Sequence, residues 1–514
     1  MRRRSFLVRT LSGGAVALRA RGFPAIQASG LRPAAAQGAA VGDVVPGRAL
    51  VWSRSDRPAR MFVDWSTTAS FADARRVAGP AALEDAGFTA RLDLTGLPNG
   101  QHIFYRVSFQ DLSDLSGWSE PVLGRFRSAP AAPRDVTLAW TADTVGQGFG
   151  INPEWGGLRI YRALREKAPD VFVHCGDTVY ADQPLVPELA LDDGSVWKNL
   201  VTPAKSKVAE TLDEFRGNHL YNLLDDHLRA FNAETAQVVL WDDHEVRNNW
   251  YPTQVLTDDP RYEVRSVALL SSRSKRAFWE HQPIRAQADE ADRVYRSIPY
   301  GPSLEIFALD MRTYRAANSE NRQQGQGPET ALLGPVQVAW LQGALRASRA
   351  TWKVIASDMP IGLVVPDGPS HFEAVANGNG PVLGREHEIA EILAFLKRER
   401  VRNVVWITGD VHYAAAHHYD PARARFAGFD PFWEFVAGPA HAGTFGPASL
   451  DDTFGPEVRF LGIPPGMKPN RPPSAGLQFF GTLRIDGRSS AMTVRLHDLT
   501  GKTLFSVELP AIQS

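Results

Sequence analysis

Residues 171–182 read VFVHCGDTVYAD, an apolar run that is followed directly by a glycine, a carboxylate and an aromatic ring. The apolar run is typical of a buried strand. Gly176 lacks a side chain, so the backbone is able to turn sharply there and a ligand is able to approach Asp177 closely. Tyr180 offers a phenolate that suits trivalent iron, and packing of its ring in the core is the alternative. The pattern therefore predicts a strand end that carries metal ligands.

Three other strand-like segments run into similar side chains. LAWTAD ends at Asp143, VVLWDDHEVRNNW holds residues 242–249, and VVWITGDVH ends at His412. The carboxyl ends of strands in layered α/β folds open into the crevice where ligands bind, so we expect the four ends to converge. Two neighbouring cations need a bridging carboxylate and several oxygen or imidazole donors. These segments predict a dinuclear or larger metal centre, bridged by Asp177.

Two histidines occupy distinctive places in these segments. Gly409 and Asp410 repeat the order of glycine and carboxylate, and His412 then lies on the same side as Asp410 if the backbone is extended. His244 follows two aspartates and precedes Glu245. Carboxylates favour the charged form of an imidazole, which suits protonation of a leaving alkoxide. A structural histidine is the alternative for His244.

Read in order, Asp143, residues 176–180, the run WDDHEVRNN at 241–249 and residues 409–412 resemble the signature of the alkaline phosphatase D (PhoD-like) family of calcineurin-like metallophosphoesterases. The stretches GQGFGINPEWGGLRIY, LDMRTYR and FWEFVAGPAHAGTFGP are also similar to this family. The resemblance covers residues 42–514. It implies an α/β fold with a four-layer α/β/β/α catalytic domain, a centre of iron and calcium, and activity on phosphate monoesters and diesters.

The resemblance also implies roles for individual residues. Asp177, Tyr180 and His412 would bind Fe(III), with Asp143 at the place of the first iron ligand. The Ca(II) ligands besides Asp177 are implied to be Asp242, Asn249 and Asp410, or Asp243 in place of Asp242. Some members of the family have cysteine where Asp143 stands, and aspartate is a harder donor, so a changed preference towards other divalent metals is expected.

Two hypotheses concern the catalytic mechanism. His244 would give the proton to the leaving oxygen, and Arg312 would stabilise charge on the phosphate, with a plain ion-paired arginine as the alternative. The middle histidine of the wider superfamily has no counterpart near residues 357–360. A smaller ligand set on one of the metals follows from that difference.

The chain is predicted to contain more than one domain, since 514 residues exceed the size of an ordinary single core. Residues 42–130 read as short strands with turn signals and resemble an all-β fibronectin type III-like sandwich. A Pro-rich stretch at 129–133 reads as a linker, and residues 134–514 are predicted to form the catalytic domain. Its later strands are expected at 237–240, 303–309, 352–357 and 403–408, and its helices at 157–167, 264–281, 336–347 and 387–397.

Residues 1–38 read as a twin-arginine-type signal segment, because paired arginines precede Phe6-Leu7 and small residues follow at 34–38. This predicts a periplasmic or secreted protein that is a substrate of the twin-arginine export machinery. A disordered basic amino terminus is the alternative, because Arg9, Arg19 and Arg21 interrupt the apolar stretch. No run of about 18 apolar residues predicts a membrane span.

Composition narrows the possible partners. Lys and Arg number 56 and Asp and Glu number 57, so net charge does not favour nucleic acid. The family resemblance implies that a small phosphate ester is the substrate. One rival function is a phospholipase D-like phosphodiesterase with a lipid substrate, in which Phe432, Trp433 and Phe435 form an apolar wall unless they pack in the core. The other rival is a non-catalytic exported binding protein on a degenerate scaffold.

Overall fold

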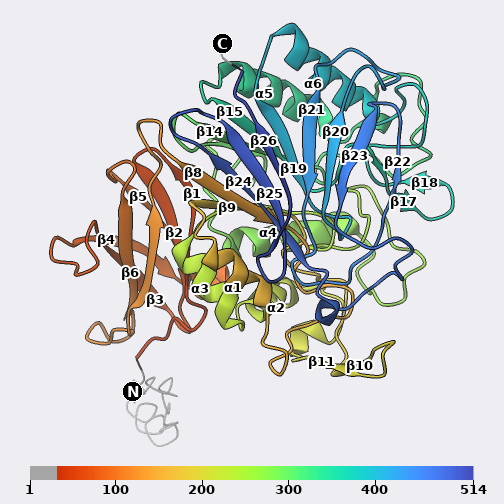
Figure 1. The fold of residues 1–514 in the computed structure, drawn as a ribbon. Coiled ribbons are helices and arrows are strands. Elements are labelled where there is room, and N and C mark those ends of the chain that lie inside the picture. Colours follow the sequence, from red (N-terminus) through yellow and green to blue (C-terminus); the bar gives the residue numbers. More distant parts are fainter. Residues whose placement is uncertain (1–31, 513–514) are drawn as a thin grey trace, which may run out of the picture.

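The computed structural model describes residues 32–512 and is shown in Figure 1. The paired arginines of the predicted signal segment lie outside the described residues. Two large sheets pack face to face, and helices cover their outer faces (Figure 1). Within residues 32–512 every helix is too short or too polar to cross a membrane.

The first sheet has nine strands, and three of its central strands carry the chain towards the candidate site. β8, β9 and β12 are parallel neighbours. Their apolar runs provide the predicted buried strands. The strand order across the sheet is β26 (Thr503–Leu509), β25 (Met492–Asp498), β24 (Phe479–Ile485), β8 (Val136–Thr141), β9 (Val171–Cys175), β12 (Ala236–Leu240), β1 (Ala39–Val45), β2 (Arg48–Arg54) and β5 (Thr89–Thr95).

The second sheet has seven strands, of which β14, β15, β19 and β21 are parallel. Its β19 is the predicted strand that leads to the fourth motif. The strand order is β13 (Arg296–Pro299), β14 (Leu304–Ala308), β15 (Trp352–Ala356), β19 (Val404–Thr408), β21 (Phe432–Val436), β20 (Ala415–Tyr419) and β23 (Pro456–Leu461). The four later strands predicted from the sequence therefore exist and differ only at their end residues.

Strand side chains alternate between two cores, as the pleat of a strand requires. Val173 packs between the two sheets, whereas Phe172 packs on the helix side of the first sheet. Helices α1 (Arg159–Glu166) and α3 (Asp226–Glu234) cover that side. Helices α5 (Gly334–Ala347) and α6 (Glu386–Arg398) cover the second sheet. The predicted α/β/β/α arrangement is confirmed.

The remaining elements surround this sandwich. α2 (Leu212–Asn222) packs against α4 (Val267–His281), whose apolar side faces a separate small core. The short elements are η1 (Glu84–Ala86), β10 (Glu188–Ala190), β11 (Val196–Lys198), η2 (Pro203–Lys205), η3 (Pro328–Thr330), β16 (Leu363–Val364), β17 (Pro366–Asp367), β18 (His371–Phe372), β22 (Ser449–Leu450) and η4 (Pro473–Ala475).

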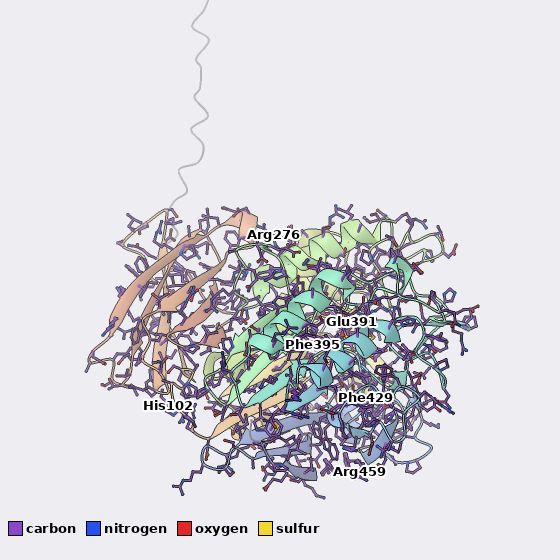
Figure 2. The ribbon with its side chains drawn as sticks, turned by 90° about the horizontal axis from the view of Figure 1, so that it is seen from above. His102, Arg276, Glu391, Phe395, Phe429 and Arg459 are labelled. Atoms are coloured by element: carbon purple, nitrogen blue, oxygen red, sulfur yellow. The ribbon has the colours of Figure 1, made fainter. Side chains whose placement is uncertain are left out.

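The amino-terminal part contains a sheet of its own and shares another. Its own sheet has the order β4 (Arg75–Ala82), β3 (Ala59–Ser66), β6 (His102–Asp111) and β7 (Val122–Arg127). Strands β1, β2 and β5 face it but extend the nine-stranded sheet, because Val41 of β1 pairs in parallel with Ala236 of β12. In Figure 2, His102 lies at the outer side of this part, away from Phe429 of the second sheet's core. One sheet thus crosses the boundary predicted near residue 130.

Candidate metal centre

The ends of four strands meet where the two sheets face each other. Asp143 follows β8, Asp177 follows β9, and Asp243 follows β12 in the first sheet. Asp410 and His412 follow β19 in the second sheet. Because these are all carboxyl ends of parallel strands, their loops open on the same edge of the sandwich. The convergence that the motifs predicted is present.

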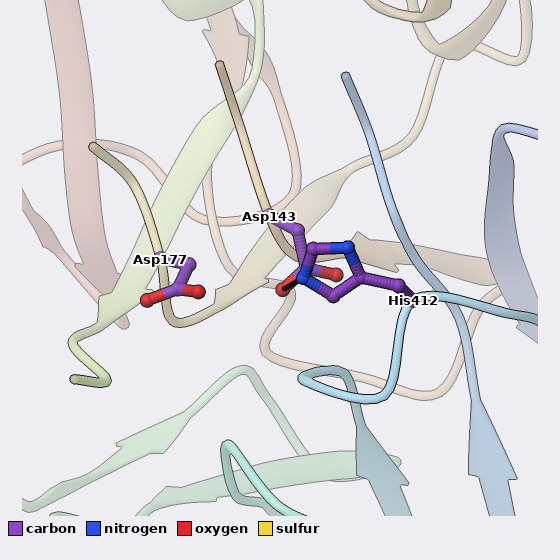
Figure 3. Close-up of side chains that lie close together, drawn as sticks. All are labelled: Asp143, Asp177 and His412. Carbon is purple, nitrogen blue, oxygen red and sulfur yellow. Dashed lines mark ion pairs between the residues drawn. The ribbon is translucent and has the colours of Figure 1, made fainter. Parts of the chain in front are cut away.

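Asp143, Asp177 and His412 form the first cluster of ligand-type atoms (Figure 3). One such atom from each residue lies within 4.8 Å of those from the other two. The Nδ1 atom of His412 lies 2.5 Å from the carbonyl oxygen of Gly443, and its Nε2 atom lies 2.9 Å from the hydroxyl of Tyr180. The Gly443 carbonyl therefore fixes the ring so that Nε2 faces the carboxylates.

Asp177, Asp243 and His244 form the second cluster, within the same 4.8 Å limit. Asp177 belongs to both clusters, so it is the carboxylate placed to bridge two ions. The Nδ1 atom of His244 lies 2.8 Å from Oδ1 of Asp182. The ring of Tyr180 stacks on that of His244 with centroids 4.3 Å apart. Tyr180 thus contacts both clusters.

The buried carboxylates fit a cation. Both side-chain oxygens of Asp143 are buried and accept no hydrogen bond from any described residue. Burial raises the pKa of Asp143 well above its ordinary value, and Asp243 raises it further. Burial also raises the pKa values of Asp177 and Asp410, with added repulsion from neighbouring carboxylates. Ionised carboxylates crowded in this way need positive charge, which a metal ion among these oxygen and imidazole donors supplies.

The surroundings of His412 and His244 shift their pKa values in opposite directions. Burial lowers the pKa of His412 to about 4, so the ring is a neutral donor. Burial also acts to lower the pKa of His244, but Asp182, Asp243 and Asp177 outweigh it and raise the pKa well above its ordinary value. His412 is therefore suited to ligate a metal through a lone pair, and His244 is suited to carry a proton.

The backbone at the site is held in the left-handed region. The φ angles of Asp143, Asp177, Asp410 and His412 are +65°, +53°, +65° and +61°. Residues other than glycine adopt such angles rarely, and those that do cluster at functional sites. Gly176, at φ +103°, has a second constraint, because a Cβ atom there would lie 2.6 Å from Cβ of Asp242. The glycine that the sequence singled out is needed for close packing of two motifs.

An open cleft of about 610 Å³ leads to these residues. Asp177, Asp243, His244, Asp410 and His412 line its polar side. Its apolar side is formed by Val364, Val365, Pro366, Phe445 and Pro447. A small molecule is thus able to reach both ligand clusters from solvent.

Arg312 does not line this cleft, contrary to the role in charge stabilisation expected from the sequence. Its side chain is fully buried, and its Nε atom donates to Oδ1 of Asp242 over 2.6 Å. It also pairs with Glu373 and lies 3.5 Å from Asp358. The ion-paired alternative describes its place, because all its nearest charged partners are protein carboxylates.

The ion pair between Arg312 and Asp242 distinguishes the two aspartates that the third motif offered as metal ligands. Asp242 is bound to Arg312 and lies outside both ligand clusters, whereas Asp243 lies in the second cluster and lines the cleft. Asn249 also lines the cleft. Its backbone N–H donates to Asp243 over 2.6 Å and its amide nitrogen donates to Asp367 over 2.9 Å. The amide oxygen is the Asn249 atom that remains as a ligand.

Four acidic residues of the site were not assigned roles from the sequence. Asp182 orients His244 as described, and Asp358 and Glu373 surround Arg312. Glu245 accepts hydrogen bonds from the backbone and hydroxyl of Thr178 and from the backbone of Asp242. Asp182 and Glu245 stand inside two of the quoted motifs, so the sequence contained a signal for them. Nothing local in the sequence marks Glu373, which reaches the cleft from a distant loop.

The aromatic wall proposed for a lipid lies elsewhere. Phe432 and Phe435 of β21 are buried in the two cores of the second sheet, and the half-buried Trp433 stacks on Phe435. None of the three lines the cleft. Phe432 and Phe435 therefore follow the core-packing alternative, and none of the three is placed to contact a lipid ester in the cleft.

The fold is that of the metallophosphoesterases, and two solved structures share it. The alignment with a structure of PhoD covers 93% of this chain and 89% of that chain, with a TM-score of 0.67 and 19% identity. The alignment with the purple acid phosphatase PPD1 from yellow lupin (Lupinus luteus) covers 92% of this chain and 73% of that chain, with a TM-score of 0.54 and 11% identity. At these identities the likeness establishes the fold alone.

The chain belongs to the PhoD-like phosphatase family. The family model for these phosphatases matches residues 138–496, and that for their N-terminal domain matches residues 20–130. Alkaline phosphatase D of Bacillus subtilis (strain 168) is 28% identical over 344 residues, which are 65% of this chain. The match spans only 55% of that relative's length. The predicted family is confirmed.

Proposed function

We propose that the chain is a metal-dependent phosphoesterase that hydrolyses phosphate monoesters and diesters. One observation carries the proposal: Asp177 is shared by two clusters of ligand-type atoms at the base of an open cleft. A dinuclear centre needs such a bridging carboxylate. The non-catalytic binding protein is disfavoured, because each of the four motifs brings a suitable donor to this place.

The ligand assignment follows the two clusters. Fe(III) would be held by Asp143, Asp177 and His412 together with the phenolate of Tyr180, which lies 2.9 Å from His412. Ca(II) would be held by oxygen donors, namely Asp177, Asp243, Asn249 and Asp410. Asp243 is preferred to Asp242 because Arg312 already pairs with Asp242. Hard oxygen donors suit calcium, and a phenolate with imidazole suits trivalent iron.

The protein's own groups supply the remaining chemistry. When bound, such ions neutralise phosphate oxygens and lower the pKa of a water molecule. His244 lines the cleft, and Asp182 holds its Nδ1 atom, so its Nε2 atom is the one placed to give a proton to the leaving oxygen. Arg312 acts indirectly, because it holds the carboxylates of Asp242 and Glu373 in place through ion pairs.

The shape of the cleft supports diesters as well as monoesters. Its volume of about 610 Å³ exceeds what a phosphate group alone requires, and its apolar side offers contact for a second ester group. A lipid ester, the substrate of the phospholipase D-like alternative, is one member of this class. Export through the twin-arginine route to the periplasm or the medium stays part of the proposal, and it rests on residues 1–38.

The test combines hydrolysis of p-nitrophenyl phosphate and bis-p-nitrophenyl phosphate with elemental analysis of the same purified protein. Asp177→Asn keeps the shape of the side chain but weakens it as a bridging ligand. We expect it to lose metal and at least about 100-fold in turnover, since even changes around metal ligands cost 10- to 100-fold. Asp258→Asn, at an exposed position, is the matched control and should behave as wild type.

The outcomes separate the alternatives. Turnover that survives in Asp177→Asn at the wild-type metal content would sink the dinuclear assignment. Wild-type protein that binds metal but hydrolyses neither ester would refute the proposed substrate range. Metal-free and inactive wild-type protein would support the binding-protein alternative.

A further inference from the structure

Two hollows adjoin on the edge of the second sheet that lies opposite the cleft. The basic hollow, of about 370 Å³, is lined by Arg346, Arg349, Lys353, Arg400 and Arg402 with Glu399. The apolar hollow, of about 280 Å³, is lined among others by Leu393, Leu396, Val401, Phe429, Phe432 and Ile512. Val401, Arg402, Asn403 and Ile512 line both. The two hollows therefore form one continuous amphipathic surface.

This surface lies at the amino ends of parallel strands. Arg349 precedes β15 and Arg402 precedes β19, whereas the metal ligands follow the carboxyl end of β19. The C-terminal segment closes one side, because Ile512 and Asn403 exchange hydrogen bonds of 2.8 and 3.1 Å. Figure 1 shows the C-terminus beside α5, at the same end of the molecule. A ligand bound there does not obstruct the cleft.

The charge of the basic hollow contrasts with that of the whole chain. The chain has 56 basic and 57 acidic residues, so its net charge is close to zero. The lining of the basic hollow holds five cationic side chains and one acidic residue, Glu399, and its Arg402 pairs over 2.7 Å with Asp430 of the adjoining apolar hollow. Glu399 lies 3.4 Å from Arg346, whereas Arg349 and Arg400 are exposed and have no carboxylate partner among residues 32–512. The hollow therefore presents positive charge to solvent.

The apolar hollow supplies a second, independent kind of contact. Phe429, marked in Figure 2, and Phe432 reach it from the core below α6. Ile512 at its rim is 56% exposed and so adds apolar surface beside the hollow. A partner that matches both hollows has to combine a negative head with an apolar tail.

We propose that this surface binds the face of an anionic phospholipid membrane, with head groups at the basic hollow and an acyl end at the apolar hollow. Juxtaposed cations and apolar side chains are the two contacts that hold proteins at such surfaces. Docking in this manner leaves the cleft on the opposite edge open to solvent. The surface acts as a tether, independent of whether the cleft hydrolyses lipids.

The test is co-sedimentation of the whole protein with vesicles. We expect binding to vesicles of phosphatidylglycerol and phosphatidylcholine, little binding to phosphatidylcholine alone, and loss of binding at about 1 M salt, where charges are screened within about 3 Å. Arg349→Glu reverses one cation and should weaken binding about tenfold or more, as expected for charges near an anionic surface. Ile512→Ser removes an apolar contact without a change in charge and should also weaken binding at low salt.

The controls keep the proposal open to refutation. Arg162→Glu reverses an exposed arginine on α1, far from the hollows, and should bind vesicles as wild type does. Hydrolysis of a soluble nitrophenyl ester should be equal in all four proteins, so a failed proposal for the cleft leaves the binding result readable. Equal binding by Arg349→Glu and wild type would overturn the proposal. So would a dimer in sedimentation velocity that Arg349→Glu dissociates, because that assigns the surface to a second copy.

Discussion

Arg312 is enclosed by carboxylates at a fully buried position, so its main contribution is to stability. Arg312→Met leaves Asp242 and Glu373 buried without their cation. We expect the free energy of unfolding to fall by about 3–5 kcal/mol, the usual cost of breaking a buried ion pair from one side. Urea denaturation of the purified variant and of wild type measures this difference.

Arg162→Met, on the exposed side of α1, serves as the comparison and should change stability by no more than about 0.5 kcal/mol. A stable Arg312→Met protein that has lost its turnover would contradict this account. It would restore the hypothesis, made from the sequence, that Arg312 stabilises charge on the phosphate.

At the scale of residues, the sequence predicted the candidate metal ligands better than the side chains that pair with them. Asp143, Asp177 and His412 could be predicted because each follows an apolar strand, and strand ends of this kind converge. The choice between Asp242 and Asp243 could not be predicted, because it depends on Arg312, which is far away in the sequence. Glu373 was missed for the same reason.

Helix α2 supports the site from outside. Asn222, its last residue, donates from its amide to the carbonyl oxygen of Thr178 over 2.7 Å, beside Asp177. The helix begins with a capping box, in which Thr211 and Glu214 each accept a hydrogen bond from the other's backbone N–H. Thr211→Ala removes one of these bonds.

We expect Thr211→Ala to lower the free energy of unfolding by about 1 kcal/mol, the usual value of an N-cap side chain. Turnover at saturating substrate should stay within about twofold, since the site is assembled whenever the protein is folded. Thr257→Ala, at an exposed bend, is a suitable reference substitution. A loss of turnover without a loss of stability would show that α2 adjusts the site directly.

At the scale of elements, apolar runs predicted the buried parallel strands of both sheets, because such strands have two covered faces. β1 could not be assigned to the nine-stranded sheet from its own residues. Its sequence, AAVGDVV, fits a strand of a separate sandwich equally well, and the pairing of Val41 with Ala236 places it beside β12. Long-range pairing of this kind leaves no local signal.

At the scale of the whole molecule, Glu234 of α3 forms ion pairs that join the amino-terminal part to the catalytic part. It accepts hydrogen bonds from Arg165 of α1 over 2.6 and 2.9 Å and from Arg125 of β7 over 3.2 Å. The bonds from Arg165 outweigh burial and lower the pKa of Glu234 below its ordinary 4.5. A lowered pKa stabilises the fold above 4.5, and this stability is lost as the pH falls through the folded value.

Glu234→Gln should therefore melt at a lower temperature than wild type at neutral pH, and the difference in Tm should shrink as the pH falls well below 4.5. Scanning fluorimetry over this pH range measures it. Glu154→Gln breaks an exposed pair with Lys198, at 2.9 Å, outside the junction, and should show a small difference at every pH. A Glu234→Gln difference that persists unchanged in acid would contradict the assignment.

The sheet shared by both parts has a consequence for the order of events during protein synthesis. The ribosome completes β1 early, but the strand that pairs beside it in parallel, β12, follows only after β8 and β9 have been made. Until then the edge of β1 has exposed hydrogen-bonding groups, which are prone to pair with other chains. The amino-terminal part is made first, but its strand pairing is therefore among the last to be completed. We expect nascent chains that stop near residue 130 to need protection from aggregation.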